Sequence, residues 1–352
     1  MTAVPVLLGQ QPAAATKPPP EPVADPGFVI RTETQLVLVP FQAVRKSQFV
    51  PDLRKEDIQI LEDGKPQRIA VFEAPSGPEK QARAIPVEVI LLLDVSLSVM
   101  NKDLLDPVLI KETFFDELGG NVTVAVYGFA QKWRRFCGPT NDPARLEKAL
   151  MEVYGYQALG TRLYEAIIAT CRDAAKSGGN VNRLMVVFSD GFSTTKALPK
   201  KAVEAARRYG ITLYPVILGH DRLAQRAGGG GGGMGGGRMR NVWGGRKLPG
   251  IGGPGGFETR QSQVHAQEFQ MAQFAALGEQ TGGRSFDPPE VNSLMIRAIL
   301  NAVVTQVRNQ YVAGYYPSGE AGKKKPRKVE VKLAKNARRK AKIQGGRRLV
   351  VD

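Results

Sequence analysis

Runs of consecutive hydrophobic residues alternate with amphipathic stretches through the middle of the chain. The hydrophobic runs predict strands over residues 87–93, 122–129, 183–188 and 211–218, and a short strand near 284–286. Apolar residues at helical spacing predict helices near residues 101–118, 143–154, 161–176, 196–209, 265–280 and 290–308. Strands that are apolar on both faces and separated by helices are typical of a doubly wound, mostly parallel sheet with helices on both faces. The predicted fold class is therefore α/β.

Both ends of the chain show a different pattern, in which hydrophobic and polar residues alternate. "FVIRTETQLVLVPFQAV" predicts β structure, and Pro40 favours an edge strand or a bulge there. Asp63-Gly64 separates two apolar runs and predicts a hairpin, while residues 329–333 predict a half-buried strand near the other end. In a parallel sheet covered by helices, the first strand begins and the last helix ends at the same edge. We therefore expect one small antiparallel β unit built from both chain ends.

These patterns divide the chain into four parts. They are a disordered leader or signal remnant (1–27), an N-terminal β unit (28–85), the α/β domain (86–309) and basic C-terminal strands that pair with the N-terminal β unit (310–352). A glycine-rich insertion, residues 227–256, interrupts the α/β domain. Such a segment buries too little apolar area to offset its ordering entropy, so we expect it to be disordered. It follows a strand and should lie over the edge where the parallel strands end.

Composition limits the classes of protein to which the chain can belong. With 352 residues, of which 42% are hydrophobic, the chain can bury at least one sizeable core. No run of about 18 apolar residues occurs, so no membrane span is expected. The first residues are similar to the end of a secretory signal but lack a basic region. We expect export to the periplasm, the cell surface or the medium, although a cytoplasmic location stays open.

The sequence offers few residues for catalysis. Cys137 and Cys171 are the only cysteines, and they form either one bridge or two unrelated buried thiols. The only histidines, His220 and His265, do not accompany a nucleophile motif. No phosphate-binding G-x-x-x-x-G-K-[ST] loop and no G-x-S-x-G elbow occurs. A haloacid dehalogenase-type phosphatase would have a second aspartate at Ser96. We therefore expect no enzymatic activity.

An unusually polar sequence ends the first buried strand, in "LLLDVSLS". Asp94, Ser96 and Ser98 lie at the strand's end, Thr161 opens a helix in "GTRLYEAI", and Asp190 follows a strand in "VVFSDG". Because parallel strands end at one edge of a sheet, these five oxygen-bearing side chains should converge. Oxygen ligands without nitrogen or sulfur suit a hard cation, Mg²⁺ or else Mn²⁺ or Ca²⁺. The alternative is that Asp94 and the serines only cap the following helix.

In this order and spacing, "DVSLS", "GTRLYEAI" and "VVFSDG" resemble the metal-ion-dependent adhesion site (MIDAS) of von Willebrand factor type A domains. The resemblance covers roughly residues 86–309, and the flanking segments resemble a bacterial, acidobacterial-type family of such proteins, whose members are mostly exported. It implies that the ion is held by Asp94, Ser96, Ser98, Thr161 and Asp190. It also implies a non-enzymatic adhesion module, in which an Asp or Glu of a protein ligand completes the coordination of the metal.

One residue departs from the family pattern. Many members have Gly between the two serines, where this sequence has Leu97. If the position required a positive φ, a branched side chain would be strained there.

The excess of positive charge suggests a second type of partner. Of the formal net charge of +16, residues 320–352 supply a large part, with thirteen Lys and Arg against three acidic residues. These strands and the "GGRMRNVWGGRK" segment could bind nucleic acid or an anionic surface polymer. The basic residues alternate with Val and Leu, however, which favours the solvated face of a sheet. Nucleic acid is therefore the less expected partner.

Overall fold

The computed structural model of the chain describes residues 36–75, 84–97, 99, 107–118, 121–156, 158–218, 255–289, 291–317, 326–335, 337 and 340–350. All of them belong to one compact unit, Thr34–Asp352. The expected leader (1–27), residues 227–254 of the glycine-rich insertion, and Ser98 lie outside the described residues. The domain boundaries given above stay predictions.

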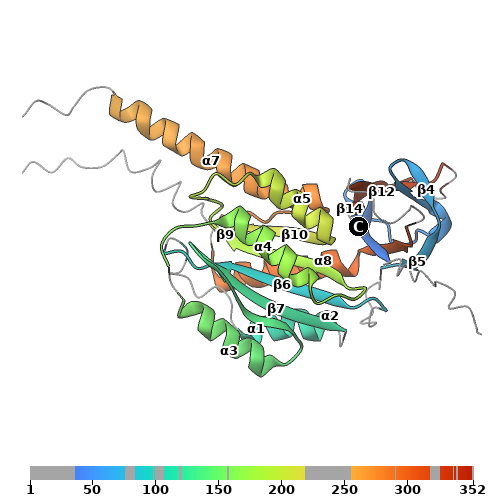
Figure 1. Ribbon diagram of the computed structural model, residues 1–352, viewed down its shortest axis with the longest axis horizontal. Coiled ribbons are helices and arrows are strands. Elements are labelled where there is room, and N and C mark those ends of the chain that lie inside the picture. The colour runs from blue at the N-terminus through green and yellow to red at the C-terminus, as the bar shows by residue number, and fades with distance from the viewer. Residues whose placement is uncertain are drawn as a thin grey trace, which may run out of the picture. The chain divides into compact units, whose positions relative to one another are not determined.

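The central sheet has five strands in the order β10-β9-β6-β7-β8 (Figure 1). The strands are β6 (Val87–Asp94), β7 (Val122–Phe129), β8 (Trp133–Thr140), β9 (Asn182–Ser189) and β10 (Ile211–Ile217). β10, β9, β6 and β7 are parallel, and β8 is an antiparallel edge strand. β8 was not predicted, because its WRRFCGPT sequence lacks a regular apolar alternation. The connection after β6 leads to β7 on one side, and the connection after β9 leads to β10 on the other side. The topological switch point of the sheet therefore lies between β6 and β9.

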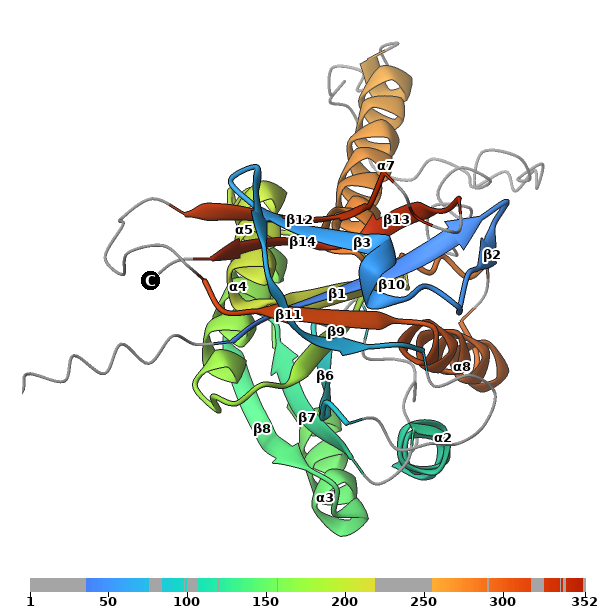
Figure 2. The same ribbon diagram turned by 90° about the vertical axis from the view of Figure 1, so that its right-hand side faces the viewer.

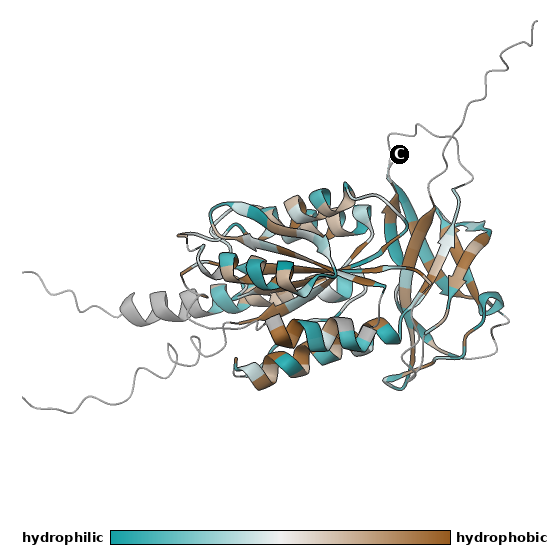
Figure 3. Cartoon of the chain, turned by 90° about the horizontal axis from the view of Figure 1, so that it is seen from below, coloured by the Kyte–Doolittle hydropathy of each residue, from teal (hydrophilic) through white to brown (hydrophobic). Residues whose placement is uncertain are grey.

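Helices cover both faces of this sheet (Figure 1). They are α1 (Pro107–Ile110), a π-helical turn η2 (Lys111–Phe115), α2 (Asp116–Leu118), α3 (Pro143–Tyr154), α4 (Leu163–Ala175), α5 (Pro199–Tyr209), α7 (Gly255–Thr281) and α8 (Ser293–Arg308). β6 directs Val89 and Leu91 toward α1, α3 and α8, and Ile90 and Leu92 toward α4, α5 and α7. The strands are correspondingly hydrophobic in Figure 3. The predicted doubly wound α/β fold is confirmed.

Three predicted elements differ in detail from the structure. The helix predicted over 101–118 is described only from Pro107 onward. α7 begins at Gly255, so the last two residues of the predicted insertion are helical. Near residues 284–286 there is a single bridge between Val216 and Phe286 rather than a strand. Within the described part of the chain, no helix is both long and apolar enough to cross a membrane.

The β unit consists of two antiparallel sheets, and each combines strands from both chain ends (Figure 2). The first has the order β13-β1-β11-β5, with β2 also pairing β1; the second has the order β14-β12-β3-β4. The strands are β1 (Val37–Arg45), β2 (Gln48–Phe49), β3 (Ile58–Glu62), β4 (Lys65–Gln67), β5 (Ile69–Glu73), β11 (Tyr311–Tyr315), β12 (Arg327–Leu333), β13 (Lys342–Gly345) and β14 (Arg347–Val350), with a 3₁₀ turn η1 (Lys55–Asp57) before β3. The expected pairing of the two chain ends is confirmed.

Two local expectations in the β unit have different outcomes. Asp63 (φ 47°) and Gly64 (φ 81°) form the two-residue turn between β3 and β4, as predicted. β1 as a whole is not an edge strand, because it pairs with β11 on one side and β13 on the other, but Pro40 itself pairs only with Val312 of β11. The ladder with β13 starts only at Phe41, so the missing N–H of Pro40 costs no hydrogen bond to that strand.

The β unit contacts the edge of the central sheet where β6 and β9 begin, which we call the amino-end edge. Asn182 Nδ2 donates to Gln310 Oε1 at 2.7 Å, and Gln42 Nε2 donates to the carbonyl of Gln306 at 2.9 Å, both buried. Gly282, after α7, lies so close to β13 that an added Cβ would be 2.7 Å from the Cα of Gly345. Direct hydrogen bonds and backbone contact therefore close this edge.

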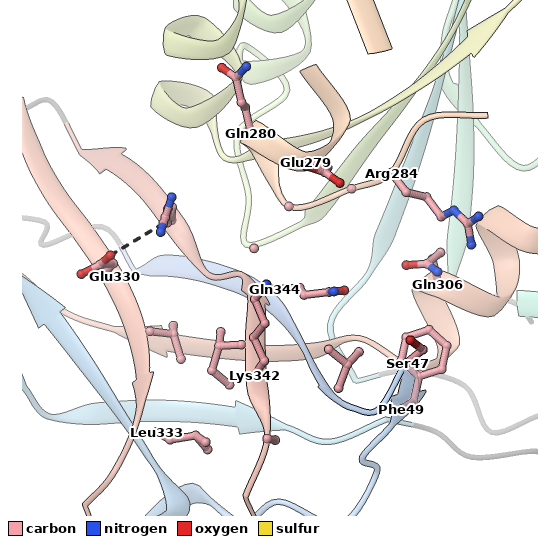
Figure 4. A pocket seen from close by; sticks show the side chains of 18 of the residues that line it. Ser47, Phe49, Glu279, Gln280, Arg284, Gln306, Glu330, Leu333, Lys342 and Gln344 are labelled. Atoms are coloured by element: carbon pink, nitrogen blue, oxygen red, sulfur yellow. Dashed lines mark ion pairs between the residues drawn. The ribbon is translucent and has the colours of Figure 1, made fainter. Parts of the chain in front are cut away.

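A cleft of about 1040 Å³ lies beside this contact, between the ends of α7 and α8 and strands β12–β14 (Figure 4). Glu279, Arg284, Gln306 and Gln344 line it, and Glu330 on its rim forms a 3.6 Å ion pair with Arg347. Apolar side chains, among them Phe49 and Leu333, line it as well, so the cleft is mixed in character. It belongs to the amino-end edge and not to the edge that carries the predicted metal ligands.

Candidate metal-binding site

The register between β6 and β9 determines the surroundings of Asp94. Leu93 pairs with Phe188, so the next residues, Asp94 and Ser189, lie side by side at the switch point. Ser189 Oγ donates to Asp94 Oδ2 at 2.7 Å, and the backbone N–H of Ser96 donates to Asp94 Oδ1 at 3.0 Å. All three residues are buried. The carboxylate is therefore oriented by its own turn and by the neighbouring strand.

Asp190 directly follows Ser189 at the same edge and is 3% exposed. Its Oδ1 accepts from the backbone N–H of Phe192 at 3.1 Å, which closes the turn. Gly191 has φ +81°, and an added Cβ would be 3.3 Å from the Cα of Met271 in α7. The glycine thus lets the turn pack against α7 and holds Asp190 in the buried edge.

Thr161, also buried, lies in the loop that leads into α4. Its backbone N–H donates to Thr194 Oγ1 at 3.1 Å, and its carbonyl accepts from the N–H of Thr194 at 2.8 Å. The next N–H, of Arg162, donates to the carbonyl of Ala130 at 3.0 Å. The loops after β7, before α4 and after β9 are thus joined at the edge where the parallel strands end, which we call the carboxyl-end edge.

The structure brings Asp94, Ser96 and Asp190 together and places Thr161 in an adjoining loop. Ser96 forms an isolated parallel bridge with Ala158, three residues before Thr161. Ser98 lies outside the described residues. The assignment of these five residues as metal ligands remains a proposal.

Leu97 is not strained. Within the described part of the chain, only Lys46, Ser47 and Asp63 are non-glycine residues with positive φ. Leu97 therefore does not have the positive φ that would disfavour a branched side chain, and its side chain is 51% exposed.

The electrostatics of the site reflect two buried carboxylates. Burial, and secondly the negative charge of Asp190, raise the pKa of Asp94 to about 7. Hydrogen bonds from Ser96 and Ser189 act in the opposite direction but do not offset these effects. A bound cation would stabilise both ionised carboxylates, so the residues present fit a divalent metal.

The atoms available at this edge also favour a hard cation. The side chains of Asp94, Ser96, Thr161 and Asp190 offer only oxygen. No group of three or more His, Cys, Asp or Glu side chains suited to a metal occurs within the described ranges. Cys137 and Cys171 are both free and buried, as expected for two unrelated thiols. Together these observations favour Mg²⁺-type over thiolate or histidine coordination.

Sequence reasoning missed Ser189, which the structure shows to orient Asp94. The residue is fully buried and also accepts from the N–H of Gly191 at 3.2 Å. Its position directly before Asp190 in "VVFSDG" was the only signal available. The role of its hydroxyl depends on the register of β9 against β6, which the local sequence does not specify.

An open α/β sheet with a polar, oxygen-rich site at its switch point defines the class of this domain. A family model described as von Willebrand factor type A domain matches residues 89–192, the segment from β6 to the turn after Asp190. The chain therefore contains a von Willebrand factor type A domain. No curated protein matches the sequence.

Solved structures are similar to this chain at low sequence identity. BatB from Bacteroides thetaiotaomicron is 21% identical, with a TM-score of 0.41 and coverage of 63% of this chain and 99% of that one. An aerotolerance-related membrane protein from Bacteroides fragilis is 18% identical, with a TM-score of 0.39 and coverage of 62% and 99%. Proximal thread matrix protein 1 from the mussel byssus, described with zinc in its MIDAS motif, is 13% identical, with a TM-score of 0.41 and coverage of 65% and 47%.

Proposed function

We propose that the chain is a non-enzymatic binding protein whose type A domain holds a divalent cation at the carboxyl-end edge. The hydroxyls of Ser96, Ser98 and Thr161, with Asp94 and Asp190, would hold the ion. The observation that carries this proposal is the pair of buried carboxylates, Asp94 and Asp190, whose mutual repulsion helps to raise the pKa of Asp94 to about 7. A cation between such groups stabilises their ionised forms.

The ligand set also indicates what the cation would do. Two carboxylates and neutral hydroxyls leave the metal with affinity for a further negative charge, and Mg²⁺ accepts carboxylate oxygens readily. An Asp or Glu of a protein ligand would therefore complete the coordination.

The polyanion alternative is weakened by the contacts of the basic C-terminal strands. Arg327 forms a buried 2.7 Å ion pair with Glu62, and Arg347 pairs with Glu330. The guanidinium of Arg348 is buried and donates to the carbonyl of Leu38 at 2.7 Å. These cations stabilise the β unit and are less available to phosphates or acidic polymers.

Thermal unfolding in increasing Mg²⁺ tests the metal site. The melting temperature of the wild type should rise with Mg²⁺ and fall again on adding EDTA. Asp94→Asn keeps the shape of the side chain but removes its charge, so the Mg²⁺-dependent rise should be lost. Asp142→Asn is a matched control, because Asp142 only caps α3, where asparagine caps equally well. An equal rise in the wild type and Asp94→Asn would exclude the proposed site.

We propose that the protein acts outside the cytoplasm, where its ligand is presented by another protein or a cell surface. This proposal is supported by the similarity of the first residues to the end of a secretory signal and by the resemblance to a mostly exported family. Detection of the native protein in cell fractions, with and without residues 1–27, measures this directly.

A further inference from the structure

The cleft between α7, α8 and strands β12–β14 contains a buried polar side chain that lacks a partner (Figure 4). Gln306, in α8, is 8% exposed, and its backbone carbonyl accepts the 2.9 Å hydrogen bond from Gln42 Nε2. Its side-chain amide lines the cleft and makes no hydrogen bond to another described residue. Burial of an amide without a partner is unfavourable. Water or a ligand in the cleft must therefore supply that partner.

A cation of the same cleft is directed at this amide. Arg284 lies between α7 and α8, and in Figure 4 its guanidinium and the amide of Gln306 point toward one another. The guanidinium carbon is 5.1 Å from the centroid of the Phe286 ring, and the N–H of Phe286 donates to the carbonyl of Pro215 at 2.8 Å. Arg284 forms no ion pair with a described carboxylate. A fixed ring thus orients a guanidinium whose charge is not balanced by an acidic partner.

The charges around the cleft favour a ligand with one negative charge. Four basic and two acidic side chains line it, and Glu330 already pairs with two of the basic ones. Of the others, Arg284 and Lys342 are opposed by one carboxylate, that of Glu279. One positive charge is therefore in excess there, and Glu279 would repel a ligand with several negative charges.

Apolar side chains line the cleft beside these polar groups. Phe49 and Ile343 come from the β unit, and Ala302 precedes Gln306 by four residues on α8, so these two share one face of the helix. With a volume of about 1040 Å³, the cleft has the size of a site for a small molecule or a few peptide residues. A ligand with both a charged and an apolar end matches this lining.

We propose that this cleft is a second binding site, which takes an organic carboxylate that carries an apolar group. The carboxylate lies between the guanidinium of Arg284 and the amide N–H of Gln306, and the apolar group contacts Phe49 and Ala302. Hydrogen bonds from a guanidinium to a carboxylate are charge-assisted and among the stronger ones in proteins. A small free acid and the carboxyl end of a peptide both offer this chemistry. Because the cleft is at the amino-end edge, its occupation does not require the proposed cation.

Titration of the full chain with phenylacetate in EDTA, followed by NMR of the ligand, tests this site. Phenylacetamide has nearly the same shape without the charge, and it should bind at least about tenfold more weakly. Arg284→Gln and Gln306→Leu should each weaken the binding of phenylacetate by about fivefold or more. Arg172→Gln, which changes an exposed arginine of α4, is the matched control and should bind like the wild type. Arg284 is itself exposed, so its variant should fold, and urea unfolding checks this.

A short peptide, acetyl-Ala-Ala-Phe, distinguishes the two sources of the carboxylate. Tighter binding of this peptide than of phenylacetate, lost on amidation of its carboxyl end, assigns the cleft to a peptide terminus. The reverse order of affinity assigns it to a small free acid, and either order supports the carboxylate site.

Three results overturn the proposal. They are equal binding of phenylacetate and phenylacetamide, unchanged binding in Arg284→Gln, and no binding by any of the probes, in which case the amide of Gln306 contacts only water. Binding that requires Mg²⁺ and disappears in Asp94→Asn also contradicts it, because the acid then binds at the metal. The proposed cation is tested separately by the melting temperature in Mg²⁺, so either proposal can fail without the other.

Discussion

The two edges of the central sheet both bury carboxylates, but the charges that act on Glu88 and on Asp94 differ. At the amino-end edge, Arg183 Nε lies 2.9 Å from Glu88 Oε2, and both side chains are almost fully buried. Burial raises the pKa of Glu88, and the guanidinium of Arg183 opposes this shift. At the carboxyl-end edge, the second influence on Asp94 is another carboxylate, Asp190, which adds to the effect of burial.

This difference indicates what each edge is for. Buried charges are tolerated when they are paired. The amino-end edge satisfies this requirement internally and is closed by the β unit through Asn182 and Gln310. At the carboxyl-end edge, no cation is among the groups that shift the pKa of Asp94. A bound metal ion would supply this positive charge, so we infer that the ion pair at the amino-end edge stabilises the fold and that the carboxyl-end edge is suited to binding a cation.

The largest expected effect on stability comes from removing the positive charge beside Glu88 at the amino-end edge. Arg183→Met leaves Glu88 buried without its partner and should lower the free energy of unfolding by about 3–5 kcal/mol. Urea unfolding of the metal-free protein measures this. The double variant Arg183→Met, Glu88→Gln should recover part of the loss, because no buried charge remains. A double variant as unstable as the single one would show that packing, not charge, dominates.

The contact between the type A domain and the β unit is tested by Gly282→Ala. This glycine has φ +94°, and the new Cβ would meet the backbone of Gly345 at 2.7 Å. Positive φ and overpacking each cost roughly 1–2 kcal/mol, so a loss of about 3 kcal/mol is expected. Gly138→Ala is the matched control, because its Cβ meets nothing within 4 Å. Equal stability of the two variants would mean that the β unit shifts freely at this contact.

The orientation of Asp94 is tested by Ser189→Ala. Loss of the 2.7 Å hydrogen bond from Ser189 frees one oxygen of the proposed ligand. Removal of such supporting groups typically weakens metal affinity by about 10–100-fold, or roughly 1.4–2.7 kcal/mol. Calorimetric titration with Mg²⁺ measures the change. Ser177→Ala, an exposed serine after α4, should leave the affinity unchanged. Unchanged affinity in Ser189→Ala would remove this serine from the site.

The smallest expected effect is a pH dependence of the metal-free protein. The folded pKa of Asp94, about 7, lies above its unfolded value, so the folded state binds more protons between the two. The contribution of this group to stability is therefore complete below about pH 4 and is lost as the pH rises through about 7. Between about pH 6 and about pH 8 the loss should be about 1.4 kcal/mol.

Asp94→Asn separates this contribution from other titrations. The variant has no proton to lose at this position, so its stability should change less between the same pH values. Mg²⁺ requires the ionised carboxylate, and its stabilising effect on the wild type should grow over this range. Parallel pH profiles of the wild type and Asp94→Asn in EDTA would contradict the raised pKa.

The local sequence determined the elements and the chemistry of the carboxyl-end edge. Buried strands and amphipathic helices have periodicities that a few consecutive residues already specify, and the oxygen-bearing residues were recognisable because they follow predicted strands. The same is true of Asp63-Gly64, whose turn depends on backbone preferences of those two residues.

Only the tertiary structure decided which residues from different strands and loops lie next to one another. The hydrogen bond from Ser189 to Asp94 and the bridge between Ser96 and Ala158 depend on strand register and loop closure. Register is fixed by the packing of a whole sheet, and not by the residues that end up opposite each other. The sequence therefore specified a polar edge suited to a cation, while the fold determined how Ser96 and Ser189 hold Asp94.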